Sequence, residues 1–386
     1  MEYMKEYYLS SCIKIKDSQS FKSLSKYINK EYSDINKIYK DLIPSETIYQ
    51  ITLNDFTGLP NLSKSIYSLG KGLFYDVEND IIFISIFRDT GFFNLKNIIY
   101  CIKDFKNFSN EITIYINKIN VIKQPLSSYL KFIFNFLRKG DHRNPFEIFS
   151  EIFVSQVIEP LVYFLLSKNN SLLLHSAGLF KEKGILIFGP QNIGKTSTAL
   201  TLAKNFGWQI LGDDFVILDN KKDICAFPKP LKIEPEQLKK FFSIKIKKRI
   251  YLPNFIRSNY EFKVSCKDFN LEICKKGKVS ILIFLNRVLE IENKISCRKL
   301  TRKESFTLLK NHGKAEFDTN KHVFRDIREL LAIQDENFKF EIFNNELSQK
   351  LLHWLSENTD SYSISFSKDV TPQEISKEIE KISQIN

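Results

Sequence analysis

The chain has 386 residues, and its 57 Lys and Arg against 45 Asp and Glu give a formal net charge of +12. This length exceeds what one hydrophobic core usually supports, so we expect two domains or one domain with a large elaboration. A hydrophobic fraction of 43% and a charged fraction of 26% exclude a disordered chain. The six cysteines include no C-x-x-C pair, so neither a zinc site nor a disulfide framework is predicted, and we expect free thiols.

The positive charge is spread along the whole chain with Ile and Asn, as a general composition bias would produce. Its densest cluster comprises Lys239, Lys240, Lys245, Lys247, Lys248 and Arg249. Such a cluster is either a solvated face or a patch that steers an acidic substrate or a phosphate. No zinc-finger, RNP-type or helix-turn-helix signature accompanies it, so a nucleic-acid partner is not predicted.

Neither the N-terminal segment nor the most apolar segment of the chain indicates a membrane protein. Residues 1–12 are charged and lack an apolar core of the kind found in signal peptides. The most apolar stretch, residues 146–166, is interrupted by Glu147, Glu151, Glu159 and Pro160, which suits a buried helix better than a bilayer span. The expected location is therefore the cytoplasm, with no membrane partner.

The first 140 residues read as a smaller α+β domain of unknown role. Apolar residues recur at helical spacing over 21–28, after a candidate cap at Ser18 or Ser20. Strand-like runs are at 47–53, 72–76, 80–87 and 111–116, and residues 127–137 look helical. Residues 138–145 are polar and contain Gly and Pro, so we predict a domain boundary there, with the second domain over 141–386.

The second domain begins with a long apolar helix, roughly residues 146–167. Strand-like runs at 172–175 and 177–180 follow, and a tight turn at 181–184 leads to another strand at 185–188. The strand at 185–188 is thus expected to be reached through an antiparallel hairpin. In Ras-like and doubly wound domains the corresponding strand is usually reached from a helix, so this lead-in favours a mixed sheet of another kind.

A helix is expected over 195–206, and Gly207 stands where a helix C-terminus favours glycine. Strands are predicted at 208–211, 215–218 and 279–285, and 225–233 is an extended segment. Capping-box patterns open two further helices. One starts at Thr301 with Glu304 and is expected to run through Leu309, and the other starts at Thr371 with Glu374.

Between the strand at 185–188 and the helix at 195–206 lies a G-x-x-x-x-G-K-[ST] sequence, residues 189–196. Amide N–H groups at a helix N-terminus have no partner within the helix, and the helix dipole favours anions there. Gly189 allows the sharp exit from the strand, and Gly194 leaves room for phosphates to approach. The alternative is a chance match in an ordinary loop.

This segment predicts that a nucleoside triphosphate is bound with Mg²⁺. Lys195 would reach the β- and γ-phosphates, and the Thr196 hydroxyl would hold the metal ion. The candidate nucleotide-binding residues are Gly189, Pro190, Gln191, Asn192, Ile193, Gly194, Lys195, Thr196 and Ser197.

Two adjacent carboxylates, Asp213 and Asp214, follow the phosphate-loop helix at a junction between strands. Phosphoryl transfer needs one carboxylate to order Mg²⁺ and another to accept the proton of the attacking hydroxyl. Neighbouring residues on an extended chain point to opposite sides, so the two should divide these tasks. Asp213 is the candidate metal ligand together with Thr196, although the pattern leaves open which carboxylate is the base. The alternative is a turn in which both merely bond nearby N–H groups.

His175 lies beside apolar residues, where an isolated histidine is as often a buried structural residue as a functional one. Four segments in order, Leu174-His175-Ser176-Ala177, 184–196, Gly212-Asp213-Asp214 and Phe227-Pro228-Lys229-Pro230, together resemble the C-terminal catalytic domain of HPr kinase/phosphorylase and its relatives. The resemblance covers roughly residues 146–310. The N-terminal part resembles no family in the same way.

The resemblance implies an α/β domain with a mixed sheet and a fold similar to phosphoenolpyruvate carboxykinase. It implies that His175 lies near the transferred phosphate, and that the two Asp residues act as general base and metal partner. Gln191 and Asn192 stand where HPr kinases usually carry Ser-Gly, and the later signature that contains Arg and Gly is not found. The resemblance therefore points to a divergent relative with an acceptor of its own, rather than to HPr as substrate.

The sequence thus predicts an enzyme that binds ATP and Mg²⁺ and transfers the γ-phosphoryl group to a hydroxyl, of the serine type, on a protein, peptide or small molecule. His175, Lys195, Asp213 and Asp214 are its candidate catalytic residues. The main alternative is a nucleotide-binding regulatory module, an ATPase or GTPase switch that phosphorylates no acceptor, and a third is a fold without turnover. The choice between ATP and GTP and the oligomeric state, including a homo-oligomer, stay open.

Overall fold

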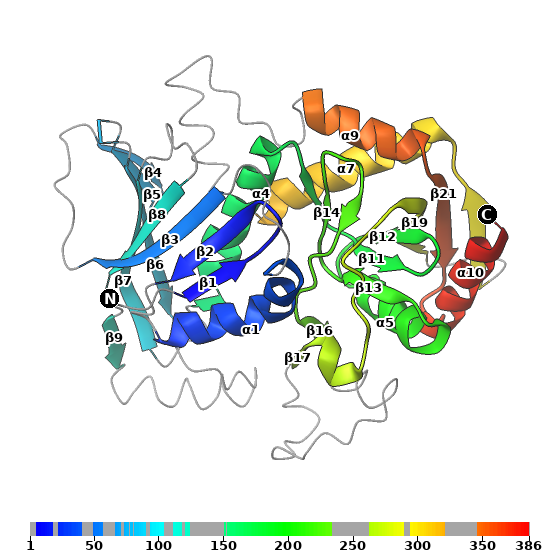
Figure 1. Cartoon of the computed structure of the whole chain (residues 1–386), viewed down its shortest axis with the longest axis horizontal. Coiled ribbons are helices and arrows are strands. Elements are labelled where there is room, and N and C mark those ends of the chain that lie inside the picture. Colours follow the sequence, from blue (N-terminus) through cyan, green and yellow to red (C-terminus); the bar gives the residue numbers. More distant parts are fainter. Residues whose placement is uncertain are drawn as a thin grey trace. The chain divides into compact units, whose positions relative to one another are not determined.

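The structure, a computed structural model, describes residues 5–17, 22–40, 49–56, 66–70, 73–76, 78–79, 81–89, 93–103, 111–117, 120–123, 150–151, 153–233, 262–288, 294–320 and 346–385 (Figure 1). It is a mixed α/β protein with several sheets, as expected. The chain divides into two compact units, and the division falls within one helix, between Val162 and Tyr163. The boundary predicted at 138–145, the helix predicted at 127–137 and the basic cluster at 239–249 lie outside the described residues.

The described strands of the first unit form one sheet in the order β1-β2-β3-β8-β7-β6-β5-β4, with β9 paired to β7. Strand order along the chain is β1 (Lys5–Tyr8), β2 (Ile13–Asp17), β3 (Tyr49–Phe56), β4 (Ile66–Gly70), β5 (Leu73–Asp76), β6 (Ile81–Asp89), β7 (Phe93–Lys103), β8 (Glu111–Asn117) and β9 (Asn120–Lys123). The four predicted strands are confirmed as β3, β5, β6 and β8, and the predicted helix as α1 (Lys22–Tyr39).

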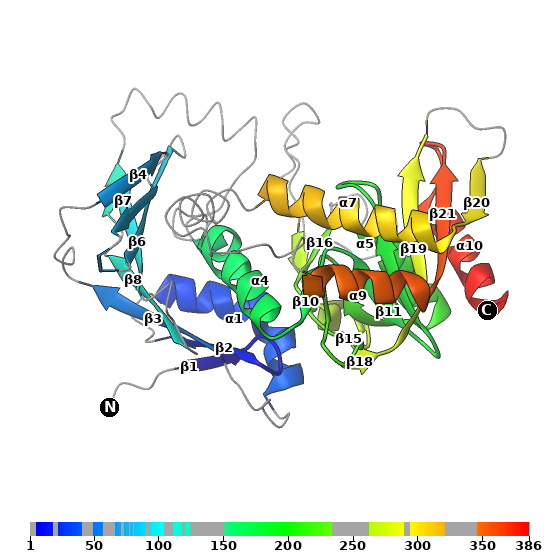
Figure 2. The ribbon, with the colours of Figure 1, turned by 90° about the horizontal axis from the view of Figure 1, so that it is seen from above.

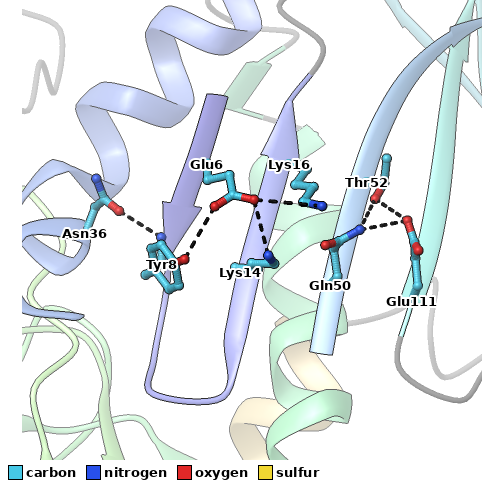
Figure 3. Close-up of polar contacts among 8 residues, drawn as sticks. All are labelled: Glu6, Tyr8, Lys14, Lys16, Asn36, Gln50, Thr52 and Glu111. Atoms are coloured by element: carbon cyan, nitrogen blue, oxygen red, sulfur yellow. Dashed lines mark hydrogen bonds and ion pairs between the residues drawn. The ribbon is translucent and has the colours of Figure 1, made fainter. Parts of the chain in front are cut away.

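Polar side chains link neighbouring strands of this sheet, as Figure 3 shows. Glu6 on β1 pairs with Lys14 on β2 at 3.2 Å. Farther along the sheet, Thr52 on β3 donates a hydrogen bond of 2.6 Å to Glu111 on β8, and Gln50 donates another of 2.8 Å. The bond from Thr52 is the largest cause of a lowered pKa at Glu111. These cross-strand bonds help to set the register of the pairs.

The apolar helix predicted over 146–167 is helical in its described part but is not uniform. A π-helical turn, η1 (Val154–Ile158), precedes α4 (Glu159–Lys168). Pro160 explains the change, because proline has no N–H to donate and its ring clashes with the carbonyl four residues earlier in a regular helix. No described helix is both long and apolar enough to cross a membrane.

In the second unit the larger described sheet has the order β13-β11-β12-β19-β21-β20, and a smaller one has the order β10-β14-β15-β18. The strands are β10 (Leu172–Leu174), β11 (Ala177–Phe180), β12 (Gly184–Phe188), β13 (Gln209–Gly212), β14 (Val216–Leu218), β15 (Ile224–Cys225), β16 (Leu231–Ile233), β17 (Phe262–Val264), β18 (Lys276–Gly277), β19 (Val279–Arg287), β20 (Ile295–Lys299) and β21 (Asp360–Phe366). The helices are α5 (Lys195–Phe206), η3 (Cys266–Phe269), α7 (Arg302–Asn320), α9 (Glu346–Glu357) and α10 (Pro372–Ile385).

The larger sheet is mixed. β11 runs antiparallel to β12 and to β13, whereas β12, β19 and β21 are mutually parallel. The antiparallel hairpin that leads into β12 is therefore confirmed. Helices α5 and α10 cover one face of this sheet, and α7 and α9 lie on the other (Figures 1 and 2). Alternate residues of the central strands, such as Ile185, Ile187 and Ile283, pack into one buried core with α5 and α10.

The two predicted capping boxes and the glycine predicted to end α5 are confirmed. Thr301 Oγ1 donates to Glu304 at 2.9 Å while the Glu304 amide donates back to Thr301 Oγ1, and Thr371 with Glu374 repeats the arrangement at the start of α10. Gly207 ends α5 with a φ of 73°, a left-handed conformation that glycine adopts without strain. Helix α7 continues to Asn320, well beyond the predicted end at Leu309.

Glu380 of α10 ties this helix to the sheet. It accepts a 2.7 Å hydrogen bond from the buried indole N–H of Trp208 and lies 3.4 Å from Lys181. Because Glu380→Ala leaves the indole N–H buried without this acceptor, we expect the free energy of unfolding to fall by about 1–3 kcal/mol. Urea denaturation of the full chain measures this.

The matched control is Glu378→Ala on the same helix. Glu378 pairs only with the exposed Lys381 among the ion pairs of the described residues, so this change should cost under about 1 kcal/mol. Equal losses in the two variants would contradict the role given to Glu380.

Candidate functional site

Two chain segments leave one sheet and enter the other at the same place. His175 and Ser176 join β10 of the smaller sheet to β11 of the larger one, and residues 213–215 join β13 to β14 in the reverse direction. The strands on either side are paired, Leu174 opposite Val216 and Gly178 opposite Gly212. The two connections therefore lie side by side. This brings His175 next to the carboxylates, although Asp213 is 38 positions farther along the sequence.

The phosphate loop leaves the same edge of the larger sheet. β11 lies between β12 and β13 and is antiparallel to both, so its first residues lie at the edge where those two strands end. Gly189 follows β12 at this edge, and Asp213 follows β13. Because neighbouring strands are about 4.8 Å apart, the loop and the carboxylates begin roughly 10 Å apart, with the segment of His175 between them.

The loop requires glycine at two positions for different reasons. At Gly189 φ is +155°, and a Cβ there would stand 3.0 Å from the carbonyl oxygen of Leu285 and from Ile193 Cγ2. At Gly194 φ is +104°, yet a Cβ would meet nothing within 4 Å. Gly189 is thus constrained by conformation and by packing against β19, whereas Gly194 is constrained by conformation and borders open space.

Lys195 is folded back across the loop. Its ammonium donates to the carbonyl oxygens of Gly189 at 2.7 Å and of Pro190 at 3.1 Å, and the side chain is 7% exposed. The other candidate loop residues differ in burial. Pro190, Gln191 and Asn192 are exposed, Gly194 and Thr196 are partly buried, and Ile193 and Ser197 are buried. The lysine therefore bonds two consecutive carbonyls at the start of the loop, while residues 190–192 of the loop are exposed to solvent.

The two carboxylates lie in a bend after β13, rather than on an extended chain, and they differ in burial. Asp213 is 5% exposed and Asp214 is partly buried. The turn that carries them is tight, since a Cβ on Gly212 would lie 2.0 Å from the carbonyl oxygen of Phe215. Only glycine fits there, so Gly212 sets the position of the pair.

The ring of His175 lies in a cluster of aromatic side chains. It is 5.4 Å from the ring of Phe215 and stacks on His312 of α7 at 5.6 Å, with 9° between the ring planes. His312 Nε2 is 2.9 Å from the carbonyl oxygen of His175 and so must donate to it. The ring of His312 also makes a T-shaped contact with the ring of Phe188, the residue directly before the phosphate loop, at 5.5 Å and 82°.

Sequence reasoning missed His312 and assigned no role to Lys229. His312 lies beyond the predicted end of its helix and 137 residues from its hydrogen-bond partner. Lys229 is 6% exposed, and its ammonium lies 5.4 Å from the centroid of Phe215. A charged residue between two prolines was the available signal for Lys229. For His312 no pattern in the sequence would have pointed to the site.

The residues at this edge fit Mg²⁺ in the manner of nucleotide sites. No group of three His, Cys, Asp or Glu side chains suited to a metal occurs in the part of the chain that the structure describes. Mg²⁺ in such sites is usually held by one or two carboxylates, a hydroxyl and the phosphates themselves, so no cage of protein ligands is needed. Thr196 and Asp213 are of the required kinds.

Comparison with known proteins does not identify a family for this chain. No protein-family model matches the sequence. No curated protein matches it either. Among solved structures, the chain is similar to the Hpr(Ser) kinase/phosphatase from Coxiella burnetii over 55% of this chain and 91% of that one, with 14% identity and a TM-score of 0.26. Since similarity at this level supports no argument, the functional proposal rests on the site.

Proposed function

We propose that the second unit binds ATP with Mg²⁺ and transfers the γ-phosphoryl group to a hydroxyl on a protein, peptide or small molecule, within a domain of the phosphoenolpyruvate carboxykinase-like type. One observation carries the proposal: the sheet register brings the loop of residues 189–196, His175 and the Asp213-Asp214 pair to a single edge. A phosphate cradle alone would suit any nucleotide-binding protein. A carboxylate pair beside it supplies what transfer to a hydroxyl requires.

The loop would hold the triphosphate. Amide N–H groups at the start of α5 favour anions, and the ammonium of Lys195 would exchange its two carbonyl partners for phosphate oxygens. Open space beside Gly194 supports the approach of a ligand to this turn. The metal ion, held by Thr196 and Asp213, would neutralise the negative charge of the phosphates.

The two carboxylates are assigned different tasks because they differ in burial. A general base must meet the acceptor as it enters, which favours the partly exposed Asp214, whereas the buried Asp213 suits a ligand held inside the site. In the reaction the acceptor oxygen bonds to the γ-phosphorus and its proton passes to Asp214. The bond from that phosphorus to the β-γ bridging oxygen breaks, and ADP keeps the electron pair. His175 would contact the phosphoryl group.

Transfer of label tests the proposal. We expect the purified full chain, incubated with γ-labelled ATP, Mg²⁺ and a cell extract, to place label in a phosphoester on a protein, peptide or small molecule. Release of the label only as inorganic phosphate would instead support the nucleotide switch. Calorimetry that detects binding of neither adenine nor guanine triphosphates would reject both functions.

A further inference from the structure

His312 of α7 lies at this edge of the sheet, and the proposed function gives it no task. Its Nε2 donates a 2.9 Å hydrogen bond to the carbonyl oxygen of His175, and its ring stacks on the His175 ring at 5.6 Å with 9° between the planes. The same ring meets Phe188, which directly precedes the phosphate loop, at 5.5 Å and 82°. One side chain thus contacts both the connection that carries His175 and the strand that leads into the loop.

The position of His312 is fixed by the helix that carries it. Ser305, Leu309 and His312 are spaced by four and three residues, so they lie on one face of α7. The hydroxyl oxygens of Ser305 and of Ser361 on β21 are 2.7 Å apart and buried, and Leu309 is buried as well. This face of α7 therefore packs on the sheet, and it brings His312 to Phe188, where β12 ends.

His175 lies where the backbone has left one strand ladder and has not yet entered the next. The paired residues of the smaller sheet end at Leu174, and those of the larger sheet begin at Ala177. The amide of Ser176 donates to the carbonyl of Leu174 at 3.0 Å, which bends the chain at His175. At this bend the hydrogen bond from His312 fixes the orientation of the peptide group that joins His175 to Ser176.

The stacked ring adds a second constraint. The torsion about the Cβ–Cγ bond of histidine has a broad distribution, so the rotamer alone does not fix the direction of the ring nitrogens. Offset stacking is one of the preferred geometries of a ring pair, so the parallel contact with His312 favours one orientation of the His175 ring. Phe215 lies on this ring as well, at 5.4 Å and 46°. The direction in which His175 presents its nitrogens therefore depends on His312.

We propose that His312 is a positioning residue, which holds His175 in the orientation that contacts the phosphoryl group during transfer. This inference rests on the proposed function. His312 acts through His175 and makes no contact of its own with the phosphoryl group. Without His312, Phe188 keeps its stacked contact with Phe284 at 5.3 Å, so the phosphate loop should stay in place. Loss of His312 should therefore slow transfer and leave nucleotide binding unchanged.

The test is a double-mutant cycle of the full chain, in which the rate of label transfer from γ-labelled Mg·ATP is measured in one cell extract. His312→Ala should lower the rate at saturating Mg·ATP by about 10- to 100-fold, as displacement of a reacting group predicts. The Mg·ATP concentration for half-maximal rate should change by less than about twofold. His175→Ala should lower the rate by about 10²- to 10³-fold, the usual loss for one group that stabilises a transition state. In that background His312→Ala should change the rate by less than about twofold, because no group remains for it to position.

His353→Ala is the matched control, because His353 also makes a T-shaped ring contact with α7, at Phe306 with 5.5 Å and 85°, and is exposed. It should leave the rate unchanged. His312→Phe keeps a ring of similar size but lacks the donor, and it replaces the Ala variant in the cycle if that variant fails to fold. An equal loss of rate with and without His175, or full activity of either single variant, overturns the inference and leaves the proposed function intact. A wild-type chain that transfers no label overturns both.

Discussion

Lys195→Met is expected to weaken Mg·ATP binding by at least about 100-fold and to abolish phosphoryl transfer. The ammonium is expected to make charge-assisted hydrogen bonds to phosphate oxygens, each worth about 1.5–3 kcal/mol, and methionine keeps the volume but makes none. The fold should survive, because one carbonyl that Lys195 now bonds belongs to the exposed Pro190, where water can replace the donor. Calorimetry with Mg·ATP and label transfer from γ-labelled ATP measure the two effects.

Lys204→Met provides the comparison for this variant, since Lys204 is exposed in the last turn of the same helix. It should bind Mg·ATP as the wild-type chain does. Full activity of Lys195→Met in a folded protein would refute the assignment of residues 189–196 as the phosphate cradle.

The second large effect concerns the carboxylate pair. Asp214→Asn should lower the rate of label transfer by about 10²- to 10⁴-fold, the usual contribution of a general base, with little change in Mg·ATP affinity. Asp213→Asn should instead raise the Mg²⁺ concentration required for half-maximal activity, because it removes a metal ligand. Rates measured over a series of Mg²⁺ concentrations separate the two outcomes.

The exposed Asp369, in the turn before α10, supplies the control Asp369→Asn, which should leave both quantities unchanged. If the two site variants shift the Mg²⁺ dependence equally, the division of tasks is wrong. If neither variant lowers the rate of label transfer, the pair has no part in catalysis.

Several helices and strands could not be predicted from the local sequence pattern. Strands β20 and β21 and helix α9 were not predicted, and the pairing of β12 with β19 and of β19 with β21 joins segments about 80–95 residues apart. Such pairs form because parallel strands bury both faces under helices, which a local window of sequence does not reveal. The π-helical turn before Pro160 was also missed, although the proline that explains it was noted.

Within the candidate site, the members that could be predicted are those whose chemistry depends on near neighbours. The phosphate loop requires two glycines, a lysine and a hydroxyl at set spacing, and the Asp pair follows a short strand. His175 was proposed only because the resemblance placed a histidine before the loop. His312 could not be predicted, since its hydrogen bond to the carbonyl of His175 joins residues 137 positions apart in the chain.

The sequence by itself determined the parts of this protein whose free energy is local: the loop between β12 and α5, the glycine that ends α5, and the two capping boxes. Only the tertiary structure decided that two connections between sheets lie together, so that His175, His312 and the carboxylates lie at the edge where the loop begins. The reason is that strand register and ring contacts depend on packing between distant segments, and their energies appear only when the sheets assemble.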